Sequence, residues 1–570
     1  MRFSSLLLVL LLAGCAGNKS IVGHDRAVNP YQFSSNKKTI AQNGAVASAH
    51  PLASQVGVAV MKQGGNAFDA AIATQLALAV VYPNAGNLGG GGFLVARTAG
   101  GELLSLDYRE KAPGAAHRDM YLDESGNVVE GKSVNGHYAS GVPGTVAGLT
   151  ETWKHARLPW EQLVQPAIDL AEKGFVLTRS EAASLNGIQE ALKQYNTQPN
   201  TFQKEHWSEG DTLVQPELAA TLKRLRDGNT AGFYEGETAN LIVQEMQRGG
   251  GIISLQDLKG YRAQWRTPHS FEYKGYKIVG MPMPSSGGVL VDQMMKMVAK
   301  FPLSSYGFLS PDAVQLMVEV ERRAFADRAE YMGDADFYKV PVETLTNDAY
   351  LADRMRDYKP GVAGRSEQVK PGQIGRHESE ETTHLSVIDK EGNAVAVTTT
   401  LNNSFGSKTV VGGAGFFLND EMDDFSMKPG VPNMYGAVGG EANAIEPGKR
   451  MLSSMTPTIV LKDNKPFLVV GTPGGTTIPT SVFQTILNII EFGLSTEDAV
   501  NKPKFHHQWL PDRVDVERSF PQETRDALEK MGYKIYQRGT IGRTEVIRVL
   551  PDGRFEAVAD VRGDDAAEGF

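Results

Sequence analysis

The chain is poor in cysteine, with Cys15 as the single one among 570 residues. One cysteine excludes a disulfide framework within the chain and a structural metal site built from several thiolates. The sequence also lacks a block of lysines and arginines, and its formal net charge is −9, so no nucleic-acid partner is expected. Beyond the N-terminus it has no apolar run as long as the roughly 20 residues of a membrane-spanning helix. These absences leave small metabolites open as ligands of a globular chain.

The N-terminus predicts export. Arg2 precedes an apolar run over residues 6–12, which is typical of a secretory signal and too short to span a bilayer as a helix. The run leads into Leu-Ala-Gly-Cys, which resembles the lipobox of bacterial lipoproteins, so residues 1–14 are expected to be removed and Cys15 acylated. A plain signal peptide with an incidental cysteine is the alternative. We expect a lipid-anchored protein of the bacterial cell envelope that faces the periplasm, and Ala16 fits sorting to the outer membrane.

Helical and strand-like segments alternate along the rest of the chain without an internal repeat, which predicts an α/β or α+β fold. Asn66 is expected to cap a helix from residue 67 to about residue 82, with Pro83 ending it. The glycine-rich segment 86–92 follows this helix and leads into a strand. That order is the reverse of a phosphate-binding loop, so the glycines predict close backbone packing instead.

Two hairpins are predicted. Strands over residues 93–96 and 103–108 would form the first, which ends at Arg109. Before the second, the chain is polar and without a hydrophobic period from about residue 365 to 381, which indicates an exposed segment.

The second hairpin can be given a register. If residues 390–392 form a three-residue loop with the glycine in the left-handed conformation, Asp389 faces Asn393. Thr382 then lies opposite Thr400. Directly opposed side chains on antiparallel strands lie within roughly 5 Å at Cβ, close enough for two hydroxyls to share a hydrogen bond.

This register suggests a nucleophile. A threonine hydroxyl is a weak nucleophile unless a base removes its proton, and the α-amino group of the same residue can be that base. Thr382 gains such an amine only if the chain is cut between Glu381 and Thr382, and the polar run before it makes that bond accessible. On the residue pattern alone, a threonine-rich strand is the favoured interpretation and the self-processed nucleophile is the alternative.

Several long motifs resemble the γ-glutamyltransferases, which are N-terminal nucleophile hydrolases. The motifs that resemble their small subunit are "TTHLSVIDKEGNAVAVTTTLNNSFG", "LNDEMDDFSMKPGVPNMYGAVGGEANA", "RMLSSMTPTIV", "GTPGGTTI" and "FHHQWLPD". The motifs that resemble their large subunit are "GGNAFDAAIA", "GGGGF", "LDYREKAP" and "FADRAEYMGD". They occur in the family's order and cover nearly everything after about residue 40.

The resemblance implies an α+β fold, a four-layer αββα sandwich, and a precursor that cleaves itself before Thr382. The products would be a large subunit of residues 15–381 and a small catalytic subunit of residues 382–570, intertwined as a heterodimer. Thr382 would attack the γ-glutamyl amide of glutathione or a related compound. Water, or an acceptor amino acid or peptide, would then take the γ-glutamyl group from the ester. No cofactor and no metal are implied.

The resemblance also assigns the site. Thr400 would position Thr382, and Gly474 and Gly475 would supply the oxyanion hole, where backbone N–H groups must approach the anion closely. Arg109 would bind the substrate α-carboxylate, since its planar guanidinium suits a bidentate contact. Some bacterial members carry glutamine at the position of Glu421. The remaining implied residues are Ser453 and Ser454 as hydroxyl donors to the carboxylate, Asp424, Glu421 and Asn402 as ligands of the α-ammonium, and Tyr435 at the tip of a lid.

Other enzyme classes lack their signatures here. The sequence has no H-E-x-x-H and no G-x-S-x-G, and the adjacent His506 and His507 cannot both face one metal from a regular helix or strand. His384 shares the face of Thr382 and is interpreted as a core histidine with satisfied hydrogen bonds, with a catalytic histidine as the less favoured alternative. Two alternatives stay open: an amide acylase of the same fold, similar to the cephalosporin acylases, and a lipoprotein that binds amino acids or peptides without turnover.

Overall fold

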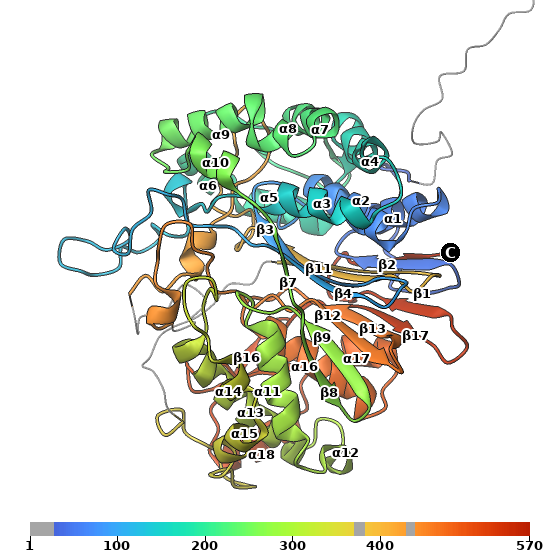
Figure 1. The fold of residues 1–570 in the computed structure, drawn as a ribbon, viewed down its shortest axis with the longest axis vertical. Coiled ribbons are helices and arrows are strands. Elements are labelled where there is room, and N and C mark those ends of the chain that lie inside the picture. The colour runs from blue at the N-terminus through green and yellow to red at the C-terminus, as the bar shows by residue number, and fades with distance from the viewer. Residues whose placement is uncertain (1–27, 370–381, 429–438) are drawn as a thin grey trace, which may run out of the picture.

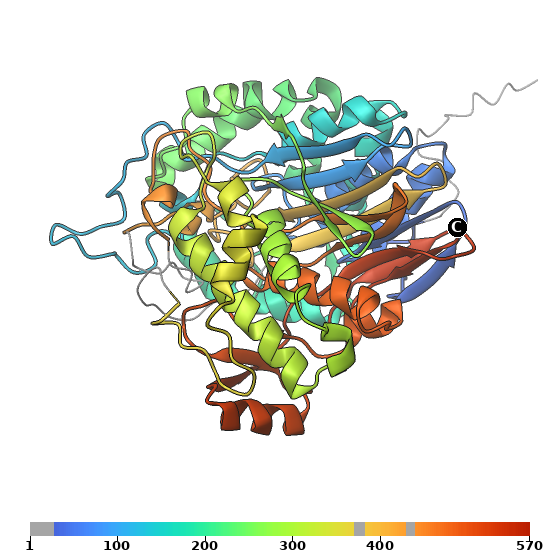
Figure 2. The same cartoon turned by 60° about the horizontal axis from the view of Figure 1, so that its bottom comes forward.

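The computed structural model describes residues 28–369, 382–428 and 439–570, in which two seven-stranded sheets lie between two layers of helices (Figure 1). Figure 2, turned by 60°, brings the lower helical layer forward and shows it lying across the second sheet. The predicted α+β class and αββα layering are confirmed. None of the helices in these ranges combines the length and the apolar character that crossing a bilayer requires.

The first sheet is antiparallel throughout. Its strands, in spatial order, are β19 (Ala566–Gly569), β2 (Gly44–Ser48), β10 (Thr383–Asp389), β11 (Ala394–Thr400), β3 (Gly91–Arg97), β4 (Leu103–Tyr108) and β7 (Gln264–Arg266). β10 and β11 follow segment 370–381 in the sequence but lie between β2 and β3, which precede it. The parts of the chain on either side of that segment are therefore interleaved in one sheet.

The second sheet repeats this interleaving. Its strands, also antiparallel, are β1 (Lys38–Ala41), β18 (Phe555–Val558), β17 (Glu545–Val549), β13 (Lys465–Gly471), β12 (Thr458–Lys462), β9 (Tyr276–Gly280) and β8 (His269–Tyr273). Small and branched apolar side chains such as Ala396, Val469 and Ile547 fill the space between the two sheets. Alternation of side chains along each strand supplies this inner face.

Helices cover the outer face of each sheet (Figure 1). On the first sheet lie α1 (Pro51–Lys62), α2 (Ala67–Val81), α3 (Thr145–Thr152), α4 (Trp160–Lys173), α5 (Arg179–Gly187), α6 (Gln189–Tyr195), α7 (Pro216–Gly228), α8 (Ala231–Tyr234), α9 (Gly236–Gly249) and α10 (Leu255–Gly260). On the second lie α11 (Gly287–Val298), α12 (Leu303–Tyr306), α13 (Pro311–Tyr331), α14 (Val342–Leu345), α15 (Asp348–Arg354), α16 (Thr477–Ile490), α17 (Thr496–Asn501) and α18 (Gln522–Met531). The short strands β5 (Phe175–Val176) and β6 (Thr212–Leu213) pair with each other, and β14 (Phe505–His506), β15 (Val514–Glu517) and β16 (Ile535–Arg538) form a small sheet.

The predicted local elements occur with small shifts at their ends. α2 begins after Asn66, whose side chain accepts from two backbone N–H groups in a capping box, and the helix ends one residue earlier than expected. The glycines that follow pack as predicted. A Cβ on Gly90 would lie 2.0 Å from the carbonyl oxygen of Thr400, and one on Gly92 would lie 2.6 Å from that of Thr398. Only glycine lets β3 and its lead-in approach β11 this closely.

The hairpin of β10 and β11 has the predicted register. Thr383 pairs with Thr399, and the N–H of Asp389 donates to the carbonyl of Asn393 at 3.1 Å. Gly392 closes the loop with φ 87°, the left-handed value that the register requires. Continued by one residue, this register sets Thr382 opposite Thr400.

Candidate active site

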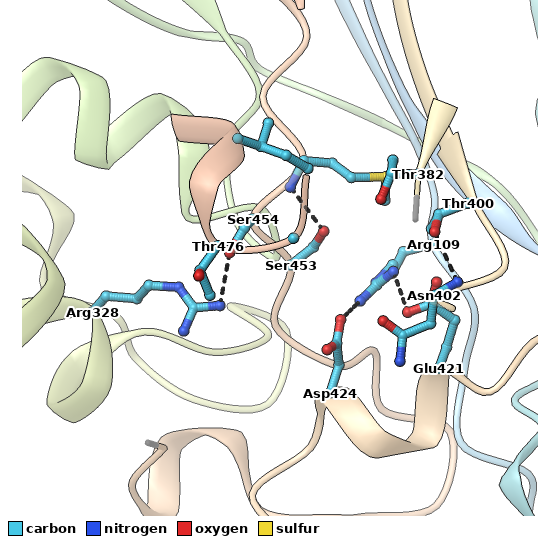
Figure 3. A pocket seen from close by; sticks show the side chains of 13 residues that line it. Arg109, Arg328, Thr382, Thr400, Asn402, Glu421, Asp424, Ser453, Ser454 and Thr476 are labelled. Carbon is cyan, nitrogen blue, oxygen red and sulfur yellow. Dashed lines mark hydrogen bonds and ion pairs between the residues drawn. The ribbon is translucent and has the colours of Figure 1, made fainter. Parts of the chain in front are cut away.

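One pocket gathers most of the predicted site residues (Figure 3). It measures about 380 Å³, part of it open to solvent, and lies at the end of the hairpin where β10 begins and β11 ends. Nine predicted residues line it: Arg109, Thr382, Thr400, Asn402, Glu421, Asp424, Ser453, Ser454 and Gly475. Gly474 is adjacent to Gly475 but is not part of the lining.

The threonine end of the pocket consists of Thr382, Thr400 and Gly475, and none of these side chains carries a charge. Thr382 is 5% exposed and Thr400 is 2% exposed. The hydroxyl of Thr400 accepts from the backbone N–H of Asn402 at 2.8 Å. This contact fixes the hydroxyl at the wall of the pocket. A hydrogen bond from Thr400 to Thr382 stays a prediction.

Gly474 and Gly475 occupy a turn between β13 and α16 whose positive φ values favour glycine. Their φ values are 134° and 54°, and a Cβ on Gly474 would lie 2.4 Å from Oγ1 of Thr477. Backbone without side chains therefore borders the pocket beside Thr382, as an oxyanion hole requires.

The charged end of the pocket consists of Arg109, Glu421 and Asp424. Arg109 directly follows β4, and the acids lie in the 3₁₀ turn Glu421–Asp424. Nη1 of Arg109 lies 2.6 Å from Oε2 of Glu421, and Nη2 pairs with the carboxylate of Asp424. The guanidinium is 1% exposed. The structure thus brings together groups from distant parts of the sequence that suit the carboxylate and the ammonium of an amino acid.

Burial decides the electrostatics of the charged end. It raises the pKa of Glu421 well above its ordinary value, against the pull of Arg109 in the other direction. It also raises the pKa of Asp424, again opposed by Arg109. Burial would lower the pKa of Arg109, but the charges of Glu421 and Asp424 outweigh it and raise that pKa. The guanidinium therefore stays charged while one or both acids can take up a proton.

Ser453 and Ser454 lie beside the charged end, between Arg109 and Arg328 (Figure 3). The hydroxyl oxygen of Ser453 accepts from the backbone N–H of Met455 at 3.1 Å. That of Ser454 accepts from Nη2 of Arg328 at 3.1 Å. Both serines are buried and line the pocket, so each contributes a hydroxyl that the protein holds by a hydrogen bond.

Four lining residues were missed in the sequence: Arg328, Met455, Thr476 and Ile478. Arg328 lies in the motif "FADRAEYMGD" near the end of α13, a helix whose residues from Ala313 to Ala329 are all buried. The helix also carries Glu319, Glu321, Arg322, Arg323 and Asp327, so no local signal in the sequence singles out Arg328. The other three directly follow predicted residues or lie close to them.

Three predicted positions, Cys15, Glu381 and Tyr435, lie outside the described residues. His384 is confirmed as a core histidine. Its Nδ1 lies 2.9 Å from Oγ1 of Thr398, its Nε2 lies 3.1 Å from Oγ of Ser386, and burial lowers its pKa to about 3. His506 and His507 are also buried, each with its own polar partners. Across the ranges 28–369, 382–428 and 439–570, no group of three or more His, Cys, Asp or Glu side chains is arranged to hold a metal ion.

A family model described as gamma-glutamyltranspeptidase matches residues 53–570. The chain belongs to this family. It is 48% identical over 535 residues to the glutathione hydrolase proenzyme of Escherichia coli (strain K12), covering 93% of this chain and 92% of that one. These matches agree with the resemblance that the motifs carried.

Solved structures of the gamma-glutamyltranspeptidase family and of an acylase share the fold. The crystal structure of cephalosporin acylase from Bacillus halodurans superposes with a TM-score of 0.82 at 27% identity, covering 96% of this chain and 99% of that one. The gamma-glutamyltranspeptidase of Helicobacter pylori matches at 42% identity with a TM-score of 0.56, over 61% of this chain and 99% of that one.

Proposed function

We propose that this protein is an autoprocessed γ-glutamyltransferase and glutathione hydrolase. One observation carries the proposal: Thr382 shares a buried pocket with Arg109 and Asp424, which suit the two charged groups of a γ-glutamyl substrate. The name of the Escherichia coli relative, a glutathione hydrolase proenzyme, supports glutathione as the substrate and a precursor that is processed.

Cleavage between Glu381 and Thr382 yields fragments 15–381 and 382–570. The interleaved strands support a lasting heterodimer, because separating the fragments would remove β10 and β11 from between β2 and β3. The cut also creates the α-amine of Thr382, which the chemistry needs as its base.

In the reaction, Oγ of Thr382 attacks the γ-carbonyl carbon and its proton passes to the α-amine. Thr400 positions the hydroxyl, and the N–H groups of Gly474 and Gly475 stabilise the oxyanion. The C–N bond then breaks, and the amine returns the proton to the leaving nitrogen. Water or an acceptor amine attacks the ester in the same way and releases glutamate or a γ-glutamyl product.

The substrate is held by its α-carbon groups. Arg109, Ser453 and Ser454 bind the α-carboxylate, while Asp424 with Glu421 and Asn402 binds the α-ammonium. In the structure Arg109 and Asp424 pair with each other, so a substrate exchanges this internal ion pair for two of its own. The α-carboxylate replaces Asp424 as the partner of Arg109, and the α-ammonium replaces Arg109 as the partner of Asp424. Every charge in the pocket therefore remains paired when the substrate enters.

The test is direct. A denaturing gel of purified protein should show two fragments, N-terminal sequencing of the smaller one should start at Thr382, and incubation with glutathione should release glutamate. An uncut chain without glutamate release would contradict the proposal and leave a binding lipoprotein as the better account.

An amide acylase is the second candidate, favoured by the superposition on the Bacillus halodurans enzyme. Asp424 separates the two functions, because a glutaryl substrate has no ammonium for its carboxylate. Faster hydrolysis of γ-glutamyl-p-nitroanilide than of glutaryl-p-nitroanilide is expected, and the reverse order would favour the acylase.

The N-terminus adds a lipid anchor on Cys15 that holds the protein in the cell envelope, facing the periplasm. The support is the lipobox-like sequence and Ala16 alone. Fractionation should find the wild type in outer membranes and Cys15→Ala in the soluble periplasmic fraction, and equal distributions would contradict the anchor.

A further inference from the structure

Arg328 is a second buried guanidinium in the pocket, and its hydrogen bonds to serine hydroxyls distinguish it from Arg109. Its side chain is 8% exposed and comes from α13, on the far side of the two serines from Arg109 (Figure 3). Nη2 donates to Oγ of Ser454 and Nε donates to Oγ of Ser286, both at 3.1 Å. Arg109 meets carboxylates, whereas in these contacts Arg328 meets hydroxyls.

The chemistry of these contacts fixes the direction of each hydroxyl. A guanidinium has five N–H donors and no acceptor, and a serine hydroxyl has one hydrogen and two lone pairs. Oγ of Ser454 must therefore accept from Arg328, and its own hydrogen has to be donated elsewhere. Since Ser454 lines the pocket, the pocket is where that donor can act.

Ser286 and Ser453 complete the arrangement. Ser286 accepts from Arg328 and donates its hydroxyl to the backbone carbonyl of Ser453 at 2.8 Å. Ser453 itself accepts from the N–H of Met455. Each pocket serine thus accepts a hydrogen bond from the protein and keeps its own hydroxyl hydrogen to donate into the pocket. Two such donors side by side suit a carboxylate.

We infer that Arg328 is a positioning residue that holds Ser454 as a hydrogen-bond donor to the substrate α-carboxylate and so contributes to specificity for γ-glutamyl compounds. This inference rests on the proposed function. Arg328 in α13 precedes the proposed cut in the sequence, and Ser454 follows it. The carboxylate site is therefore complete only when both fragments are present. Arg328 also sets the local charge: burial raises the pKa of Asp424, and the positive charge of Arg328 acts with that of Arg109 against the rise.

The test is a double-mutant cycle in the full chain with γ-glutamyl-p-nitroanilide. A lost hydrogen bond to a charged group weakens binding by about tenfold or more, so Arg328→Gln and Ser454→Ala should each raise KM about tenfold with kcat within about threefold. If Arg328 acts through Ser454, the double variant should be no worse than about the poorer single variant. Arg328→Lys keeps the charge but not the fork, and should recover part of the loss.

Two further measurements separate a positioning role from a structural one. Arg323 lies on the same helix and pairs with Glu319 and Asp357, away from the pocket lining. Arg323→Gln should lower the melting temperature and leave KM unchanged. For wild type, 4-aminobutyrate, which lacks the α-carboxylate, should inhibit far less than L-glutamate does, and Arg328→Gln should narrow this difference.

Specific outcomes overturn the inference. If the KM increases of the two single variants multiply in the double variant, Arg328 acts independently of Ser454, through Asp424 or on the substrate itself. A fall in kcat with unchanged KM would make it structural. If Arg328→Gln stays uncut, Arg328→Lys carries the cycle, and unchanged KM in a cleaved Arg328→Lys enzyme would also overturn it. Failure of the proposed function is seen separately, as a wild type that neither cleaves nor releases glutamate.

Discussion

The two ends of the pocket are assembled from very different distances along the chain. The threonine end comes mainly from one hairpin, in which the pairing of Thr383 with Thr399 places Thr382 opposite Thr400. The charged end joins Arg109 to Asp424, which are 315 residues apart, and it is rich in buried charge where the threonine end has none. The two ends therefore differ in how they form. A local hairpin positions the proposed reacting groups, whereas the tertiary fold brings together the groups proposed to bind the substrate.

The largest effect is expected at the threonine end. Thr382→Ala removes the nucleophile of both self-cleavage and turnover, so the chain should stay as a single band and activity should fall by more than about a thousandfold. Thr383→Ala is the matched control, because neighbouring side chains in a strand point to opposite faces. It should be cut and active. A cleaved or active Thr382→Ala protein would show that the threonine end does not supply the reacting atoms, and would contradict the division of tasks between the two ends.

At the charged end we expect recognition to fail while self-cleavage survives. Arg109→Ala should raise KM for γ-glutamyl-p-nitroanilide about a hundredfold, because the α-carboxylate loses its charged partner, and Arg109→Lys should raise it less since charge without the fork remains. The cleaved fraction on a gel should change little, because the carboxylate contact is absent from processing. Equal losses in cleavage and binding would instead show that Arg109 is structural.

The difference in sequence distance also explains what the sequence could reveal. The register of the hairpin follows from the loop with Gly392, so geometry alone predicts Thr382 opposite Thr400. The helix capped by Asn66 and the hairpin that leads to Arg109 are likewise local and were predicted to within two residues at their ends. No local pattern brings Arg109 to Asp424, and only the resemblance to a family did so.

Arg328 was predicted neither from local sequence patterns nor from the resemblance to a family. It lies inside a motif that carried the resemblance, but its role depends on α13 packing against the turn that holds Ser454. A contact between a helix and a distant turn has no periodicity in the sequence. The αββα layering was likewise implied by the motifs rather than worked out from strand patterns, since the order of strands in each sheet interleaves distant segments.

The acids of the charged end predict a pH dependence of binding. Burial raises the pKa of Asp424, so on acidification its carboxylate takes up a proton before an exposed aspartate would and loses its attraction for the ammonium. KM should therefore rise as the pH falls, and Asp424→Asn should raise KM by about tenfold at neutral pH and flatten the acidic limb. Steady-state kinetics between about pH 4 and 8 measures this, since the ordinary carboxyl pKa lies near 4. An unchanged acidic limb in Asp424→Asn would assign the titration to another group.

The smallest effect on activity is expected at His384, which lies on the face of Thr382 but within the core and acts instead on the pH dependence of stability. Burial lowers its pKa to about 3, whereas an unfolded histidine has a pKa of 6.5. Below 6.5 the unfolded chain therefore binds a proton that the folded chain refuses, so stability is full above that pH and is lost as the pH falls toward 3. By pH 5 this one residue should cost about 2 kcal/mol.

His384→Gln should reduce the fall in melting temperature between pH 7.5 and pH 5, while the buried His506 and His507 keep their share. Comparing each protein with itself at the two pH values cancels any cost of the glutamine at neutral pH. The variant should also keep the shape of the wild-type pH profile of kcat, because the proposed base at the threonine end is the amine of Thr382. A changed kcat profile would give His384 a part in the chemistry and place a titrating group at the end of the pocket that has no charged side chain.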